Sequence, residues 1–228
     1  MQTHPTAFHK TLYVCFAAAL MMIWLNGCTS TGYQKGDVAA TSMQRAAAEV
    51  QLEGRAMDQT MAALSELISQ TNGDLKAPYK RYSESLDRVI ALAQKTEDTG
   101  REMEQKNAAY LAEWDRQLAA IDYGHIHEIS ESRRTAVTNN LEAIRRRYQE
   151  SQAAVQPLIS YLLDIRRALS ADLTVDGLEA LKGVAQNANN NVAKVQTALD
   201  GLSHELTASS AGMSSVAYQA NAAPAVPR

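Results

Sequence analysis

The chain has 228 residues, of which 46% are hydrophobic, 21% charged and 6% aromatic, and its formal net charge is −3. Its alanine-rich composition, with few glycines and prolines, excludes an all-β sandwich, which needs frequent turns and many β-branched or aromatic strand residues. It also excludes a doubly wound α/β domain, because no Val/Ile-rich strand alternates with a helix. The charge balance gives no reason to expect a nucleic-acid partner.

Residues 1–27 have the pattern of a signal peptide. Their apolar run of about 14 residues is shorter than the roughly 20 residues that a transmembrane helix needs. The run ends in Leu25-Asn26-Gly27-Cys28, which resembles the lipobox of bacterial lipoproteins, although Asn26 is a less usual residue at its position. The resemblance implies cleavage after Gly27 and acylation of Cys28. An uncleaved signal anchor is the alternative interpretation.

The residue after the cysteine indicates a location. Lipoproteins kept at the inner membrane often have Asp there, whereas this chain has Thr29. We therefore expect a protein anchored by lipid to the outer membrane and facing the periplasm, or held at the inner membrane if sorting differs. Cys15 lies in the segment predicted to be removed, so Cys28 is the only thiol of the processed chain. Neither a disulfide nor a Cys/His metal site is expected.

The processed chain divides into three parts. Residues 28–35 are predicted to be the lipidated cysteine and a tether, residues 36–208 a helical coiled-coil bundle, and residues 209–228 a disordered tail. In the bundle, apolar residues recur at alternating spacings of four and three, which places them on one stripe of a helix. Four such segments joined by short turns must fold back on one another. The predicted fold class is all-α, an elongated antiparallel four-helix coiled-coil bundle.

The first segment ends near Gly73, which terminates a helix, and Asp74 can cap the next one. The second segment has a polar middle, since Thr96, Gly100 and Asn107 lie at seam positions. A bend, a polar layer that sets the register, or a thinning of the bundle would each explain them. The two predicted seams are Met43, Ala47, Val50, Gly54, Met57, Met61, Leu64 and Ile68, and Leu75, Tyr79, Tyr82, Leu86, Val89, Ala93, Thr96, Gly100, Met103, Asn107, Tyr110, Trp114, Leu118 and Ile121.

The chain reverses again at residues 122–125. Pro157 lies inside the third segment and predicts a kink. Asp172 or Thr174 caps the fourth segment, in which the asparagine-rich stretch 187–191 is interpreted as a solvated helix face rather than a bend. The seams are Ile129, Val137, Leu141, Ile144, Tyr148, Ser151, Val155, Leu158, Leu162, Ile165 and Leu169, and Leu178, Leu181, Ala185, Ala188, Val192, Val195, Leu199, Leu202 and Leu206.

Aromatic residues lie at or beside these seams. The tyrosines are interpreted as core residues whose hydroxyls reach the rim of the bundle. Trp114 has the same interpretation, with a partner surface as the alternative. The set is Tyr79, Tyr82, Tyr110, Trp114, Tyr148 and Tyr161.

No catalytic, cofactor-binding or metal site is predicted, because no nucleophile, phosphate-binding or zinc motif occurs. His125 and His127 are interpreted as solvated residues of a turn, since positions two apart do not share a helix face. A group of arginines is the one candidate binding feature, for an anionic surface. Pairing with acidic neighbours is the simpler interpretation. These residues are Arg133, Arg134, Arg145, Arg146 and Arg147.

The stretch from Leu75 to Lys182 resembles an uncharacterised family of bacterial lipoproteins known only as a domain of unknown function. The resemblance implies a lipobox followed by a helical region, and it brings no activity. The matching pieces are Gly73-Asp74-Leu75, Tyr82-Ser83-Glu84-Ser85, Ala112-Glu113-Trp114-Asp115, Arg145-Arg146-Arg147-Tyr148 and Gln156-Pro157-Leu158.

We therefore expect a non-enzymatic structural, spacer or scaffold protein of the cell envelope, held to the membrane by acyl chains on Cys28. The alternative is a membrane-surface or lipid-handling protein that uses the arginines. A third possibility is an adaptor for a partner helix, or self-association, through the seam between Thr96 and Asn107.

Overall fold

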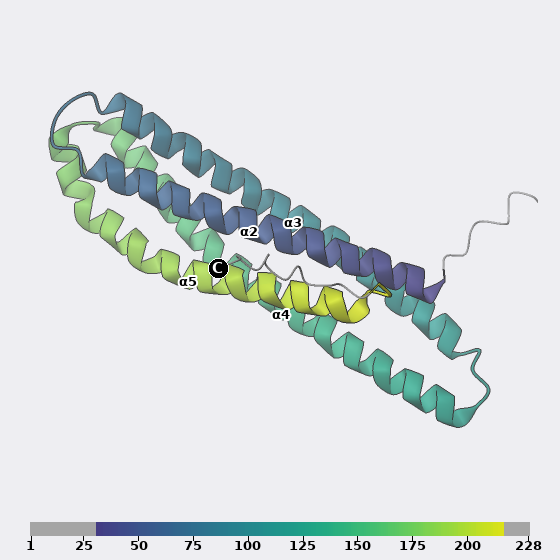
Figure 1. The fold of residues 1–228 in the computed structure, drawn as a ribbon. Helices are drawn as coiled ribbons and strands as arrows, with labels where there is room; N and C mark the ends of the chain where they lie inside the picture. The colour runs from purple at the N-terminus through teal and green to yellow at the C-terminus, as the bar shows by residue number, and fades with distance from the viewer. Residues whose placement is uncertain (1–30, 217–228) are drawn as a thin grey trace, which may run out of the picture. The chain divides into compact units, whose positions relative to one another are not determined.

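The computed structural model describes residues 31–216, and its four helices lie in one unit that starts at Gly32. The helices are α2 (Gly32–Ile68), α3 (Lys76–Leu118), α4 (Gly124–Ala171) and α5 (Val175–Met213). The described residues contain no strand. The predicted all-α, antiparallel four-helix bundle is confirmed (Figure 1). Within residues 31–216, no helix is long and apolar enough to cross a membrane.

The helices form a ring in chain order. α2 packs on α3 and α5, and α4 closes the ring between them. Contacts between opposite ends of the helices fix the antiparallel arrangement: Arg81 near the start of α3 pairs with Glu66 near the end of α2. At the other end, Lys35 Nζ lies 3.6 Å from Glu113 Oε2. Each connection therefore joins helices that are neighbours in space.

Most of the predicted seam residues belong to one hydrophobic core. Seam residues such as Val50, Leu86, Leu162 and Leu202 are fully buried. Ile129 is the exception, since it was predicted in the third seam and its side chain is 58% exposed. The prediction is wrong there because α5 ends beside residue 133, so the first turns of α4 have no fourth helix to pack against.

The helices extend past the predicted bundle 36–208 at both ends. α2 begins at Gly32, inside the expected tether, and α5 continues to Met213, inside the expected tail. The two ends support each other, because the Asp37 carboxylate accepts hydrogen bonds of 2.6 Å from the backbone N–H and the hydroxyl of Ser215. The signal peptide, Cys28 and the tail beyond residue 216 lie outside the described residues.

The turns follow the predicted capping residues. Gly73 has φ +93°, a conformation that glycine adopts without strain. Asp74 Oδ1 accepts a hydrogen bond of 3.0 Å from the Lys76 N–H. Of the two caps proposed for the last helix, Thr174 is the N-cap: its hydroxyl oxygen accepts from the Gly177 N–H at 3.1 Å.

Two irregular stretches leave their helices intact. α4 runs without a break through Pro157, so this proline does not end the helix. In α5 the asparagines of 187–191 are exposed while Ala188 between them is fully buried. This confirms the solvated helix face.

Candidate functional site

A polar layer interrupts the apolar core at the middle of the bundle. It joins Glu53 of α2, Thr96 of α3 and Tyr148 of α4. The Glu53 side chain is fully buried, and neither of its carboxyl oxygens has a hydrogen bond of ordinary geometry within the described residues. Burial raises the pKa of Glu53, and the neighbouring Thr96 side chain offsets only part of that rise. The layer therefore favours a protonated, neutral carboxyl group.

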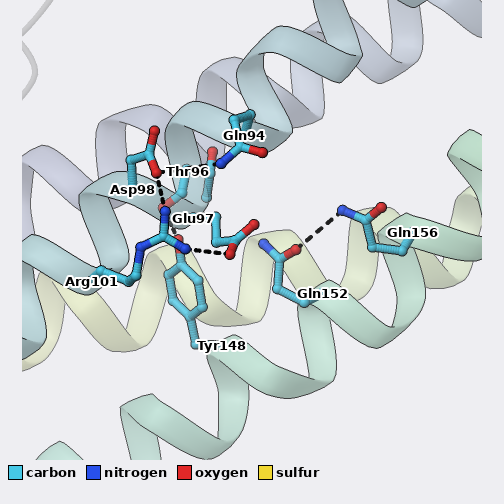
Figure 2. Close-up of polar contacts among 8 residues, drawn as sticks. All are labelled: Gln94, Thr96, Glu97, Asp98, Arg101, Tyr148, Gln152 and Gln156. Carbon is cyan, nitrogen blue, oxygen red and sulfur yellow. Dashed lines mark hydrogen bonds and ion pairs between the residues drawn. The ribbon is translucent and has the colours of Figure 1, made fainter.

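Gly100 makes room for the tyrosine of this layer. A Cβ on Gly100 would lie 2.6 Å from the Tyr148 hydroxyl oxygen and would overlap its ring. The Tyr148 hydroxyl donates a hydrogen bond to the backbone carbonyl of Thr96 (Figure 2). Burial raises the pKa of Tyr148, and the nearby carboxyl groups of Glu53 and Glu97 act in the same direction.

The polar middle of α3 is part of a polar layer, which is one of its three possible explanations. Thr96 and Asn107 are both buried, with less than a tenth of their surface exposed. The chain itself covers these two side chains, and docking of a partner along this seam stays a prediction.

A groove of about 570 Å³ runs beside Gly100 and Tyr148 between α3 and α4. On the α3 side of the groove, Arg101 pairs with Glu97 and Asp98. On the α4 side, Gln156 Nε2 donates to Gln152 Oε1 at 3.5 Å (Figure 2). Glutamine amides donate and accept hydrogen bonds but do not titrate. The groove is suited to binding polar groups and offers no paired nucleophile and base.

The structure separates the five candidate arginines. Arg134 pairs with Asp115 of α3, and Arg133 donates a hydrogen bond of 2.9 Å to the Gly212 carbonyl of α5. Both therefore fasten α4 to its neighbours. Arg146 follows Arg133 by 13 residues, roughly 20 Å along the helix. The arginines do not form one patch.

The second arginine group is more open. Arg147 Nη1 lies 3.2 Å from Glu150 Oε2, as the interpretation of pairing expects. Arg145 and Arg146 are exposed, and no ion pair forms with either of them inside residues 31–216. They are the part of the predicted anionic-surface contact that remains available to a ligand.

The two histidines lie in the first turn of α4. His125 is exposed, and His127 Nδ1 is 3.9 Å from Glu131 Oε2. Over the described part of the chain, no three His, Cys, Asp or Glu side chains gather as a metal site would require.

The hydroxyls of Tyr79, Tyr82, Tyr148 and Tyr161 donate hydrogen bonds to the backbone of a neighbouring helix, whereas the sequence predicted them at the rim of the bundle. Tyr82 Oη donates to the Leu162 carbonyl at 2.6 Å, and Tyr161 Oη to the Val184 carbonyl at 3.1 Å. Trp114 behaves similarly, since its indole N–H donates to Ser130 Oγ at 3.0 Å. These bonds hold α4 to α3 and α5.

Comparison with known proteins identifies a family. A family model described as Protein of unknown function (DUF2959) matches residues 24–209. The matched stretch includes the Leu25–Cys28 motif and nearly all of the four helices. No curated protein and no solved structure matches the chain.

Proposed function

The chain belongs to the DUF2959 family of proteins of unknown function, and we propose that it is a lipid-anchored, non-catalytic spacer or scaffold of the cell envelope. One observation carries the proposal. Cys28 of the lipobox-like motif precedes the first residue of α2, Gly32, by four residues. Four extended residues span at most about 14 Å, so a lipid on Cys28 would hold the bundle close to the membrane.

Acylation is physically sufficient for such an anchor. Each methylene buried in the bilayer contributes about 0.8 kcal/mol, and two chains already hold a protein stably. Thr29 after the cysteine favours the outer membrane, with the bundle facing the periplasm. The match of the family model from residue 24 onward supports the motif as part of the family.

The bundle suits a spacer because its length is set by its helices. α2 has 37 residues, so its far end lies roughly 55 Å from Gly32. The core is filled by packed side chains along this length, and the α3–α4 groove presents amides and charges rather than an enclosed cavity.

Membrane fractionation of cells that express the full chain tests the anchor. We expect Cys28→Ser to abolish acylation and to move the protein out of the detergent-soluble membrane fraction, with mass spectrometry of the N-terminal peptide as the readout. Cys15→Ser is the matched control, because it makes the same exchange in the segment predicted to be removed. An unmodified Cys28 in the natural chain would contradict the proposal.

A membrane-surface or lipid-handling role is the second candidate, and the exposed, unpaired Arg145 and Arg146 favour it. Unacylated Cys28→Ser protein should then bind anionic vesicles at low salt and dissociate at high salt. Arg145→Gln with Arg146→Gln should abolish this binding. The control pair Arg55→Gln with Arg88→Gln removes the same charge from other exposed positions and should not.

A further inference from the structure

Exposed apolar side chains gather at one end of the bundle. Among the described residues, six large hydrophobic side chains are between 52% and 77% exposed. All six lie near the start of α2, the start of α4 or the end of α5. Elsewhere on the described surface, Leu52 and Val175 are 40% and 41% exposed. The six are Tyr33, Val38, Tyr123, Ile126, Ile129 and Val216.

These segments share one end of the molecule. Lys35 of α2 contacts Glu113 near the end of α3, and Asp37 binds Ser215 just after α5. The turn from α3 to α4 follows Glu113 by a few residues, and Figure 1 shows it at the end where α2 begins. The apolar side chains are therefore at the end of the bundle that the chain enters from residue 31.

Tyr123, Ile126 and Ile129 form what we call the apolar tip. They recur every third residue from the N-cap of α4, so they lie on one side of its first turns. No part of α5 covers them, because Arg133 already contacts Gly212 at the end of α5. Because the three side chains lie together and uncovered, they are suited to contact with something apolar.

The charges around the tip do not indicate an electrostatic partner. Arg134 is paired with Asp115, Arg133 is bound to the Gly212 carbonyl, and His127 faces Glu131. Asp122 and Glu128 add negative charge beside the tip. A partner would therefore be held by apolar contact and not by attraction to a charged surface.

We propose that the apolar tip inserts into the lipid surface that carries the acyl chains of Cys28. The inference rests on the proposed lipid anchor, because chain length keeps Cys28 within about 14 Å of Gly32 at this same end. A membrane anchor commonly combines a lipid with a second contact, and tyrosine and aliphatic side chains suit the interface. Two contacts at one end hold the bundle upright, with the Gly73 turn away from the membrane.

The experiment couples the processed chain, which starts at Cys28, to maleimide lipid in phosphatidylcholine vesicles that contain brominated lipid. Trp114 is the only tryptophan of this chain, so Trp114→Phe supplies a background without tryptophan. Ile126→Trp places a reporter in the apolar tip, and Asn72→Trp places the control in the turn at the other end. We expect strong quenching of the fluorescence at position 126 and none at position 72.

A second measurement removes the tip. Ile126→Ser with Ile129→Ser should reduce binding of unacylated Cys28→Ser protein to the same neutral vesicles about tenfold, with little dependence on salt. The matched control, Leu52→Ser with Val175→Ser, removes two exposed apolar side chains from other places and should leave binding unchanged. All of these positions are solvent-exposed, so the variants should fold, as circular dichroism will verify.

Three outcomes would overturn the inference. Equal quenching at both positions means that the bundle lies flat, and absence of quenching at position 126 means that the tip stays in water. A doubled mass of the unacylated chain that disappears with the serine pair means that a second copy covers the tip. Because the lipid is attached chemically, these outcomes are independent of whether cells acylate Cys28, which the fractionation experiment decides.

Discussion

The Tyr148 ring of α4 occupies the space that a side chain on Gly100 of α3 would need. This pair lies in the polar layer. The Tyr148 hydroxyl also donates a hydrogen bond to the backbone carbonyl of Thr96 in α3. The absence of a Cβ at position 100 is therefore a packing requirement of the α3–α4 interface, and it differs from the requirement at Gly73, where the backbone conformation decides.

Gly100→Ala should destabilise the bundle by about 1 kcal/mol. Overlap with the Tyr148 ring should lower the free energy of unfolding by roughly 1–3 kcal/mol. The better helix propensity of alanine offsets about 1 kcal/mol of this loss. Gly201→Ala is the matched control in α5, where a Cβ meets no neighbour, and it should stabilise the chain. Urea unfolding measures both. Gly100→Ala should lower the free energy of unfolding more in the natural chain than in a Tyr148→Ala background. An equal effect in both backgrounds would show that the overlap does not exist.

Glu53→Gln should remove a pH dependence from the stability. The folded chain holds the Glu53 proton more tightly than the unfolded chain, because burial raises its pKa. The stability that Glu53 contributes is therefore fully present below the pKa of the unfolded chain, about 4.5. It is lost as the pH rises through the higher pKa of the folded chain. Unfolding free energies measured from pH 4 upward should decline in the natural chain and less steeply in Glu53→Gln.

Glu49→Gln provides the comparison for that experiment. Glu49 lies one turn earlier on α2 and pairs with Lys95 Nζ at 2.8 Å. This variant keeps Glu53 in place and should keep the decline with pH. Identical pH profiles for all three proteins would show that Glu53 is not the group responsible.

Arg116→Gln should raise the pKa of Glu113. The pKa of Glu113 is lowered to about 2, mainly by hydrogen bonding from the Arg116 guanidinium and to a lesser extent by Gln117 and Lys35. The resulting stability is present above the ordinary pKa of 4.5 and is lost as the pH falls through about 2. Carbon NMR of the Glu113 carboxyl group follows the titration directly. Arg45→Gln, which removes a distant guanidinium, should leave it unchanged.

Thr174→Ala should destabilise the chain by about 1 kcal/mol, because it removes the hydroxyl that accepts from Gly177 at the start of α5. Thr174→Ser keeps the hydroxyl and should retain most of the stability. Thermal unfolding of the two variants is the measurement. A larger loss from Asp172→Ala than from Thr174→Ala would assign the capping role to the aspartate.

The alternating spacing predicted most of the core, because a helix that packs on neighbours must bury one stripe. It missed Glu53, which lies between the seam positions Val50 and Gly54. α2 packs on both α3 and α5, so it buries a stripe wider than the two positions per heptad of a simple coiled coil. A buried glutamate at a flanking position looks like a solvated residue in the sequence.

The polar layer could be located in the sequence but not interpreted. Thr96 and Gly100 stand out at apolar positions of α3, yet their partners Glu53 and Tyr148 lie more than 40 residues away in the chain. The prediction that Ile129 is buried was wrong for a related reason. Its spacing fits the seam, but α5 ends before it reaches Ile129. Periodicity reports which face is apolar and does not report where a neighbouring helix stops.

The position of α2 between α3 and α5 has a mechanical consequence. A pull on the chain at Gly32 acts along the axis of α2, so the interfaces with α3 and α5 are loaded in parallel and must slide along their whole length together. The first turns of α4, which have no α5 beside them, would instead separate one contact at a time. We therefore expect α2 to resist tension from the N-terminal side more strongly than the first turns of α4 would.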